Sequence, residues 1–147
     1  MPGIETLSLI FIAGFFATYA HLLTAKWVDG VGLPKLDLSA AISELTFADA
    51  YDGKPPYLLG TGVILINGIL LALIYATLVA PLLPGSLLVR GLLWGLFLFL
   101  VSGCFFAPVI MKDGFFMSKV HSRAWVTALI VHLEYGAIIG WLCPVVQ

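Results

Sequence analysis

Long uninterrupted runs of apolar residues, separated by short polar segments, are the main pattern along this chain. A membrane-spanning helix needs about 20 mostly apolar residues, because the hydrocarbon core is about 30 Å thick and a helix rises about 1.5 Å per residue. Four runs meet this length, at about residues 6–26, 57–80, 87–111 and 121–142. Each run is continuous rather than alternating, which favours helices over barrel strands. The sequence therefore predicts an all-α, integral membrane four-helix bundle that forms a single transmembrane domain over residues 1–147.

The long connection between the first two runs, residues 28–56, carries a short helical pattern of its own. Asp37 can cap a helix over residues 38–45. One face of that helix is apolar and the other polar, the first formed by Leu38, Ala41, Ile42 and Leu45 and the second by Ser39, Ser43 and Glu44. We expect an interfacial amphipathic helix whose apolar face lies on the bundle or on the lipid headgroups.

Composition supports a membrane protein and excludes other classes. Residues of the set AVILMFWYC make up 61% of the chain, against roughly 45–50% apolar residues in soluble domains. Charged residues make up 10%, against about 25% in soluble domains. The net charge of −1 leaves no basic surface for nucleic acid, and so apolar a chain is not intrinsically disordered.

Lysine and arginine are distributed unevenly between the two sides of the predicted bundle. The loops after the first and third runs carry Lys26, Lys35, Lys54, Lys112, Lys119 and Arg123, whereas the opposite side carries Arg90. Because cytoplasmic loops are enriched in these residues, both loops are predicted to be cytoplasmic and both termini outside. The expected location is a bacterial-type inner (cytoplasmic) membrane, with the first run retained as a helix because its head contains Glu5 and no basic residue.

Small residues recur at four-residue spacing in all four predicted helices. In lipid no hydrophobic force drives helices together, so close backbone approach along such faces is what holds them. The residues expected in helix contacts are Ala13, Ala17, Gly68, Ala72, Gly91, Gly95, Ala128, Gly136 and Gly140. The pattern predicts a tight bundle, or docking on the helices of other proteins.

Four polar residues within the predicted helices are candidates for function: His21, Asn67, His132 and Glu134. Polar groups in the bilayer are costly and usually face protein or a cavity. His132 and Glu134 are two residues apart, so they point about 200° from each other and cannot form one compact site. Glu134 is expected to be protonated, paired with a neighbouring helix, or in contact with a partner subunit. Its candidate hydrogen-bond partners are Asn67, Tyr19, Tyr75 and Tyr135.

Both intramembrane histidines follow an alanine by one helical turn, Ala17 before His21 and Ala128 before His132. A small residue at that position leaves room for a flat macrocycle whose metal the imidazole binds. His21 and His132 are therefore candidate ligands of a tetrapyrrole, haem or chlorophyll. The alternative gives both histidines hydrogen-bonded packing roles. The two are expected at different depths, which disfavours a single macrocycle ligated by both.

Motifs of conventional catalysis are missing from the sequence. It contains no Ser/His/Asp constellation, no paired carboxylates on one helical face, no metal-binding cysteine set and no glycine-rich phosphate loop. Cys104 and Cys143 are expected at different depths and unpaired. We therefore expect a protein that is not an enzyme and holds no metal centre.

Several stretches carry a family resemblance. They are residues 13–18 (AGFFAT), 32–38 (GLPKLDL), 83–86 (LPGS), 90–95 (RGLLWG) and 132–136 (HLEYG). In this order they resemble the YagU-like and related families of small uncharacterised inner-membrane proteins with four helices. The resemblance implies a fold and a membrane location but no activity, and Glu134 departs from the apolar residue expected between His and Tyr.

The leading functional prediction is a non-enzymatic accessory or structural subunit that packs against other helices of a larger membrane complex, for example a respiratory or otherwise energy-transducing one. Small size, small-residue faces on every helix and almost no extramembrane mass motivate it. The expected partners are other integral membrane subunits, a homo-oligomer and the lipid bilayer. One alternative is a tetrapyrrole-binding protein that uses His21 and His132. A second is a small oligomeric channel or permease, with Glu134 and Asn67 lining a path at a protomer interface.

Overall fold

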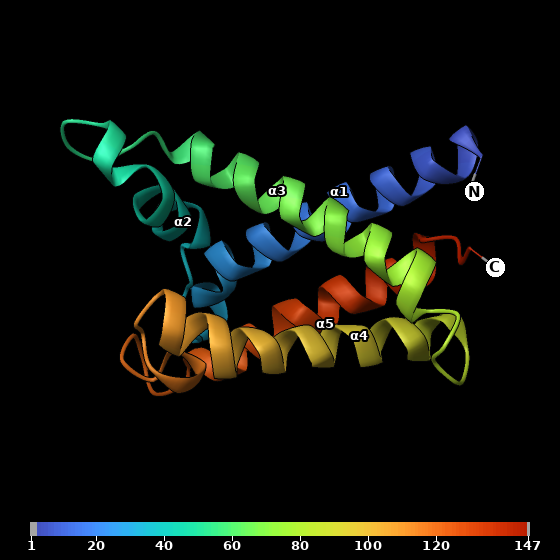
Figure 1. The fold of residues 1–147 in the computed structure, drawn as a ribbon. Helices are drawn as coiled ribbons and strands as arrows, with labels where there is room; N and C mark the ends of the chain where they lie inside the picture. The colour runs from blue at the N-terminus through green and yellow to red at the C-terminus, as the bar shows by residue number, and fades with distance from the viewer. Residues whose placement is uncertain (1–2, 147) are drawn as a thin grey trace.

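The computed structural model describes residues 3–146, and the regular elements within that range are all helical. The long helices are α1 (Ile4–Trp27), α3 (Tyr57–Ile74), α4 (Leu87–Val101) and α5 (Ala124–Leu142), as Figure 1 shows. Two π-helical segments extend α3 and α4, namely η3 (Tyr75–Val79) and η4 (Ser102–Ile110). The connections contain the short helix α2 (Leu38–Phe47) and single turns η1 (Val28–Val31), η2 (Ala48–Ala50) and η5 (Phe115–Met117).

Four helical stretches are long and apolar enough to cross a membrane. They are Ile4–Val31, Tyr57–Val79, Leu87–Ile110 and Ala124–Leu142. Each predicted run is thereby found as an apolar helix of sufficient length, with ends that differ from the predicted ones by a few residues. The chain is a multi-pass membrane protein built from four apolar helices.

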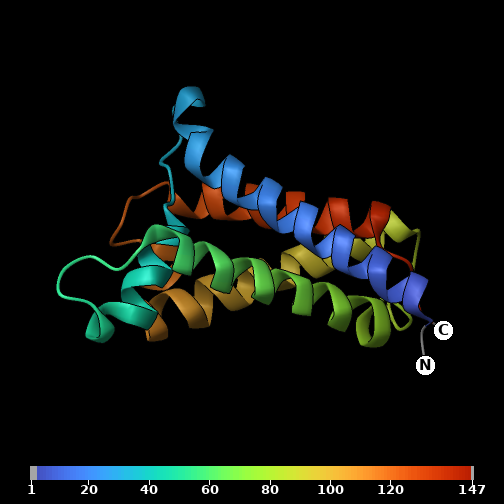
Figure 2. The same cartoon turned by 90° about the horizontal axis from the view of Figure 1, so that it is seen from above.

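The four long helices form two layers, with α1 packed on α3 and α4 packed on α5. The layers are joined mainly where α1 contacts α5 (Figures 1 and 2). In Figure 1 α3 lies close to α4 at the end that carries the termini and diverges from it toward α2, which packs on α3, whereas α1 crosses α3 and approaches α5 toward the α2 end. The arrangement therefore opens at the α2 end, between α3 and α4.

Glycines bring α4 and α5 into backbone contact. A Cβ added to Gly91 would meet the carbonyl oxygen of Gly136, and one added to Gly95 would meet the carbonyl oxygen of His132. A Cβ added to Gly140 would lie 2.6 Å from the carbonyl oxygen of Leu87. Because any side chain at these positions would strike the neighbouring main chain, the close approach requires glycine.

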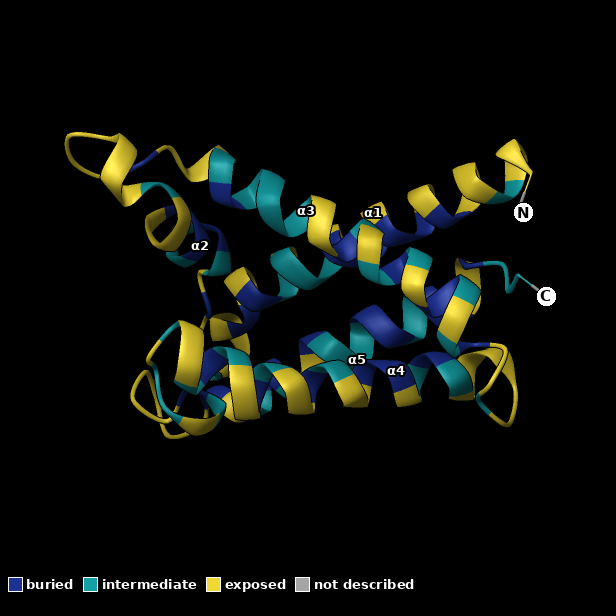
Figure 3. Cartoon of the chain, in the orientation of Figure 1, coloured by how far each residue is buried: buried dark blue, intermediate teal, exposed yellow. Residues whose placement is uncertain are grey.

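The contact between α1 and α3 also depends on small residues. A Cβ added to Gly14 would lie 2.9 Å from the Cα of Ile69, and one added to Gly68 would meet the side chain of Thr18. Ala17 and Ala72 are fully buried in the same layer. Figure 3 shows buried residues on the facing sides of the helices and exposed residues on their outer faces, as expected where lipid is the solvent.

The short helix over residues 38–45 is present, as α2, and it is two residues longer than predicted. Asp37 caps it, since its carboxylate accepts a hydrogen bond of 3.2 Å from the backbone N–H of Ala40. The predicted burial of its apolar face is wrong in part. Ser39 and Ser43 are almost fully buried, whereas Leu45 is exposed.

Gly60 on α3 explains which face of α2 is buried. A Cβ at Gly60 would meet the carbonyl oxygen of Ser39 and lie 2.6 Å from the backbone nitrogen of Ser43. So close an approach admits only small side chains. The serine hydroxyls are also satisfied there, because Ser43 donates to the carbonyl of Pro56 (2.8 Å) and Ser39 accepts from Thr61 (2.9 Å). Elsewhere, Cys104 and Cys143 are both free, as predicted, with Cys104 exposed and Cys143 buried.

Candidate functional site

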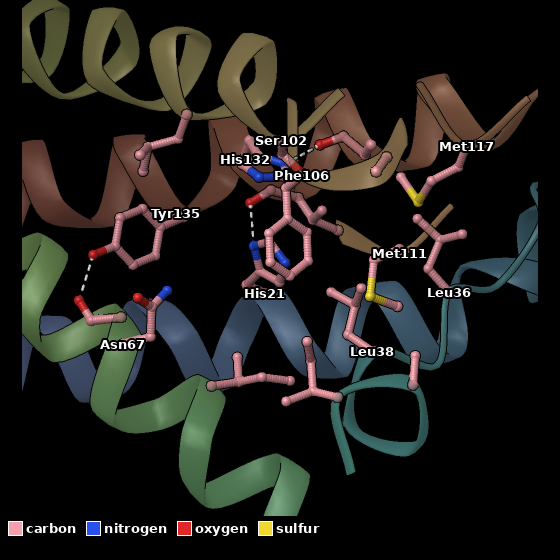
Figure 4. Close-up of a pocket in the computed structure, with 18 of the residues that line it drawn as sticks. His21, Leu36, Leu38, Asn67, Ser102, Phe106, Met111, Met117, His132 and Tyr135 are labelled. Carbon is pink, nitrogen blue, oxygen red and sulfur yellow. Dashed lines mark hydrogen bonds between the residues drawn. The ribbon is translucent and has the colours of Figure 1, made fainter. Parts of the chain in front are cut away.

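A cavity of about 510 Å³ lies between the two layers, on the side where α3 and α4 diverge. Its volume is within the range of roughly 300–1,000 Å³ that is usual for small-molecule pockets. Residues of α1, α2, α3, α4, η4 and α5 line it, and Figure 4 shows the side chains around it. The walls contributed by α3 and α4 are mainly apolar, with Ile64 and Leu71 on α3 and Leu98 and Val101 on α4.

The helix that forms the α4 wall of the cavity changes from α-helical to π-helical geometry at Ser102. From Ser102 to Ile110 the chain is π-helical, with Pro108 inside the segment. Proline removes a backbone donor and disfavours regular α-helical continuation. Both Ser102 and Phe106 of this segment line the cavity. Departures of this kind are often found at functional sites in helical proteins.

His21 and His132 lie side by side in the cavity wall. Their ring centroids are 5.1 Å apart and their planes are inclined at 79°, an edge-to-face contact. The prediction that they lie at different depths is wrong. Helix α1 ends at Trp27 and α5 begins at Ala124 at the same end of the bundle, so each histidine lies a comparable distance from that end.

Backbone carbonyls fix the orientation of both imidazoles. The Nδ1 atom of His21 is 3.1 Å from the carbonyl oxygen of Val131, and that of His132 is 2.7 Å from the carbonyl oxygen of Ala128. A carbonyl oxygen can only accept a hydrogen bond, so each Nδ1 carries the proton that it donates. In the neutral ring the lone pair is then on Nε2.

Asn67 and Tyr135 form a second polar group along the cavity. The Tyr135 hydroxyl donates a 2.6 Å hydrogen bond to the carbonyl oxygen of Gly68, and Asn67 precedes that glycine on α3. In Figure 4 these two side chains lie toward one end of the cavity. The opposite end has an apolar part formed by Leu36, Leu38, Met111 and Met117, and the charged residues Lys35, Asp37 and Asp113 also line the cavity beside it.

Glu134 lies outside this cavity, at the contact between α1 and α5. Its Oε1 atom accepts a 3.0 Å hydrogen bond from the hydroxyl of Thr24 on α1. Its Oε2 atom is sealed from solvent and has no partner among residues 3–146. The structure thus pairs Glu134 with a neighbouring helix, through Thr24 rather than through Asn67 or a tyrosine. Asn67 and Glu134 are not brought together within one chain.

The space that the sequence analysis assigned to a tetrapyrrole is occupied in part by protein. Ala17 is fully buried with Ala13 and Ala72 in the packed core, and it does not line the cavity. Ala128 does line the cavity, next to His132. Of the two alanines, the one before His21 therefore leaves no room for a macrocycle, and tetrapyrrole ligation stays a prediction. Among residues 3–146, no group of three or more His, Cys, Asp or Glu side chains could hold a metal ion.

The sequence analysis did not single out Thr18, Thr24 or Ser102. Thr18 lies against Gly68 and lines the cavity, Thr24 binds Glu134, and Ser102 opens the π-helical segment. Hydroxyl residues are common in membrane helices, where they bond to their own backbone. Thr18 and Thr24 each lie one helical turn from His21 in the sequence, and this spacing could have indicated them as neighbours of the site.

Comparisons of this chain with protein-family models, curated proteins and solved structures found no match. The resemblance to YagU-like proteins therefore stays a prediction. The fold and composition define a class, a multi-pass membrane protein of four apolar helices, with a cavity between its two layers that apolar and polar side chains line together.

Proposed function

We propose that this chain binds a bilayer-soluble amphipathic small molecule in the cavity between α3 and α4. One observation carries the proposal: His21, His132 and Asn67, from three different helices, line a cavity whose walls on α3 and α4 are mainly apolar. Polar side chains within a membrane helix are costly unless they meet a partner. A ligand with a polar head and an apolar body would satisfy both parts of this surface.

The small-residue faces support a ligand rather than a docked partner helix. The glycines of α4 and α5 contact each other, and Gly14 and Gly68 of the other layer contact α3 and α1. These faces are occupied by contacts within the chain. The outer faces instead carry large apolar side chains such as Leu58 and Ile66, which suit lipid. The accessory-subunit prediction therefore loses the small-residue part of its motivation and stays a prediction from size and composition.

Access from the bilayer also favours a lipid-soluble ligand. Val101 on α4 lines the cavity and is 41% exposed. The lining residue Ile64 on α3 is half-buried. A molecule dissolved in the hydrocarbon region could reach the cavity between these helices without crossing water.

Purification from native membranes in mild detergent, followed by solvent extraction and mass spectrometry, tests the proposal. We expect a defined lipophilic molecule at close to one per chain. Ser102→Phe would fill part of the cavity and displace that molecule, whereas Leu100→Phe, two residues earlier on the exposed face of α4, would retain it. If the wild type and Ser102→Phe carry the same lipids in the same amounts, the proposal is wrong.

The same purified fraction separates the other hypotheses. Stoichiometric additional membrane subunits would favour the accessory-subunit prediction. A Soret or chlorophyll absorption band that vanishes in His132→Ala would favour tetrapyrrole binding. Liposome flux that depends on Glu134 would favour the channel hypothesis, for which a single chain supplies no shared path because Asn67 and Glu134 lie apart.

A further inference from the structure

The two histidines offer hydrogen-bond acceptors to the cavity. Both Nδ1–H groups are used by backbone carbonyls, those of Val131 for His21 and Ala128 for His132. A positive charge within the bilayer is strongly disfavoured, so we treat both imidazoles as neutral. Each ring then presents only the Nε2 lone pair. The sealed polar atoms without a partner among residues 3–146 are Trp94 Nε1 and Glu134 Oε2, so neither Nε2 atom is shut off from the cavity.

Two hydroxyl groups in the cavity wall are also restricted to accepting. The Tyr135 hydroxyl donates its proton to the carbonyl of Gly68, and the Thr18 hydroxyl donates its proton to the carbonyl of Gly14 at 2.7 Å. Each oxygen keeps lone pairs but has no second proton to give. With the histidines, four side chains from α1 and α5 therefore face a ligand as acceptors. The lining side chains that can donate to it are Asn67 and Ser102 within the bundle and Lys35 at the end near α2.

Aromatic rings surround the histidine pair. His132 makes edge-to-face contacts with His21 (5.1 Å between centroids) and with Phe99 (6.2 Å), and Phe106 also lines the cavity. A flat aromatic head would pack well among such rings. His132 and Tyr135 are three residues apart on α5, about 4.5 Å along the helix axis. Acceptors are thus spread along the length of the cavity, with Tyr135 near one end and the histidine pair further along it (Figure 4).

We infer that the ligand is a hydroquinone with an apolar tail, and that the cavity binds this reduced form in preference to the corresponding quinone. The inference rests on the proposed function. The hydroquinone presents two O–H donors to the acceptors of His21, His132 and Tyr135. The quinone presents two carbonyl oxygens instead, which would leave acceptors facing acceptors and desolvated lone pairs unmatched. The tail would lie along the apolar walls and the apolar part formed by Leu36, Met111 and Met117.

A matched pair of ligands tests the inference. The purified protein in detergent is titrated, without oxygen, with a decyl-substituted benzoquinol and with the benzoquinone of the same substitution, and binding is followed by equilibrium dialysis. The two probes have the same tail and nearly the same shape, so their affinities differ mainly through the hydrogen bonds. We expect the quinol to bind about 10-fold more tightly or better, since each mismatched buried hydrogen bond is worth about that factor.

A variant that keeps the ring and removes the acceptor locates the effect. His132→Phe should bring the quinol-to-quinone preference down toward one, with quinone binding retained. His121→Phe is the matched control, because His121 is exposed and outside the cavity, and it should keep the preference. His21→Phe repeats the test from α1, should the first variant fail to fold.

The outcomes distinguish the two proposals. If both probes bind equally, or the quinone binds more tightly, the inference is overturned while ligand binding stands. If neither probe binds but Ser102→Phe still removes a different copurified molecule, the hydroquinone assignment alone is overturned. If neither probe binds and Ser102→Phe keeps the same lipids as the wild type, the proposed function fails as well.

Discussion

The bundle contains two neighbouring helix pairs that differ in how closely they approach. Helices α4 and α5 meet backbone to backbone through Gly91, Gly95, Gly136 and Gly140. Helices α3 and α4 are also consecutive in the chain, yet a cavity of about 510 Å³ separates them. Both pairs are apolar, so hydrophobicity does not explain the difference. In lipid, the placement of small residues decides which pairs of helices can approach to backbone contact.

Two glycines of α3 pack on helices other than α4. Gly68 lies against Thr18 on α1, and Gly60 lies against the backbone of α2. The α3 residues that face the cavity include Ile64 and Leu71, which hold the helices apart. The glycine contacts thus set the positions of the helices, and the space left between α3 and α4 is available for a ligand.

The largest expected effect comes from filling the tight contact. Gly136→Val places carbon against the carbonyl of Gly91 and within 2.9 Å of the Cα of Gly95, neither of which can move without separating the helices. We expect a loss of about 3 kcal/mol in the free energy of unfolding, measured in mixed micelles. Gly62→Val is the control, because nothing lies within 4 Å of a Cβ there. Equal stability of the two variants would show that the glycine contact does not hold the layer together.

A second close contact, between α2 and α3, should show a smaller effect of the same kind. Ser43→Leu forces a large side chain into a buried site near Gly60 and removes the hydrogen bond to Pro56. We expect a loss of about 2 kcal/mol, with faster proteolysis of the loop at residues 28–56. Leu45→Ser on the exposed side of α2 should change neither quantity. The reverse ranking would mean that the apolar face of α2 is the one that packs.

The four helices could be predicted from the sequence because bilayer thickness sets a minimum length for each apolar run. Residues such as Gly91, Gly95 and Gly136 could be expected in contacts because lipid leaves few other ways to associate. Which helix each would meet could not be predicted, since four-residue spacing is the same in every span. The burial of Ser39 rather than Leu45 depends on Gly60, which lies 21 residues further along the chain.

The candidate site was predictable only as a set of polar residues. His21, Asn67 and His132 stand out because polar groups within a span are costly. Their meeting at one cavity depends on the antiparallel packing of α1 and α5, which brings residues 110 positions apart into contact. A cavity is a place where contacts fail to form, and no local pattern in a sequence records that. Glu134 shares the signal but lies elsewhere, against Thr24.

The open region should tolerate the kind of change that the tight region does not. Ser102→Phe adds a large side chain toward the cavity, where the volume can hold it. We expect the free energy of unfolding to change by less than about 1 kcal/mol, far less than for Gly136→Val, because no backbone has to move. Unfolding of the ligand-free proteins in mixed micelles measures this. A loss as large as that of Gly136→Val would show that the α3–α4 gap is packed and closed.

The smallest expected effect concerns one of the polar contacts between the two layers, the hydrogen bond from Thr24 to Glu134. Hydrogen bonds between membrane helices contribute about 0.6 kcal/mol on average and about 1.7 kcal/mol at most. A double-mutant cycle of Thr24→Val and Glu134→Leu should therefore give a coupling energy near the lower figure. Glu134→Gln keeps an acceptor for the Thr24 hydroxyl and should stay close to the wild type in stability. A coupling energy of zero would mean that this hydrogen bond does not help to hold α1 against α5. A coupling energy above about 2 kcal/mol would exceed what one such bond supplies. It would indicate that the unpartnered Oε2 atom of Glu134 makes a second contact.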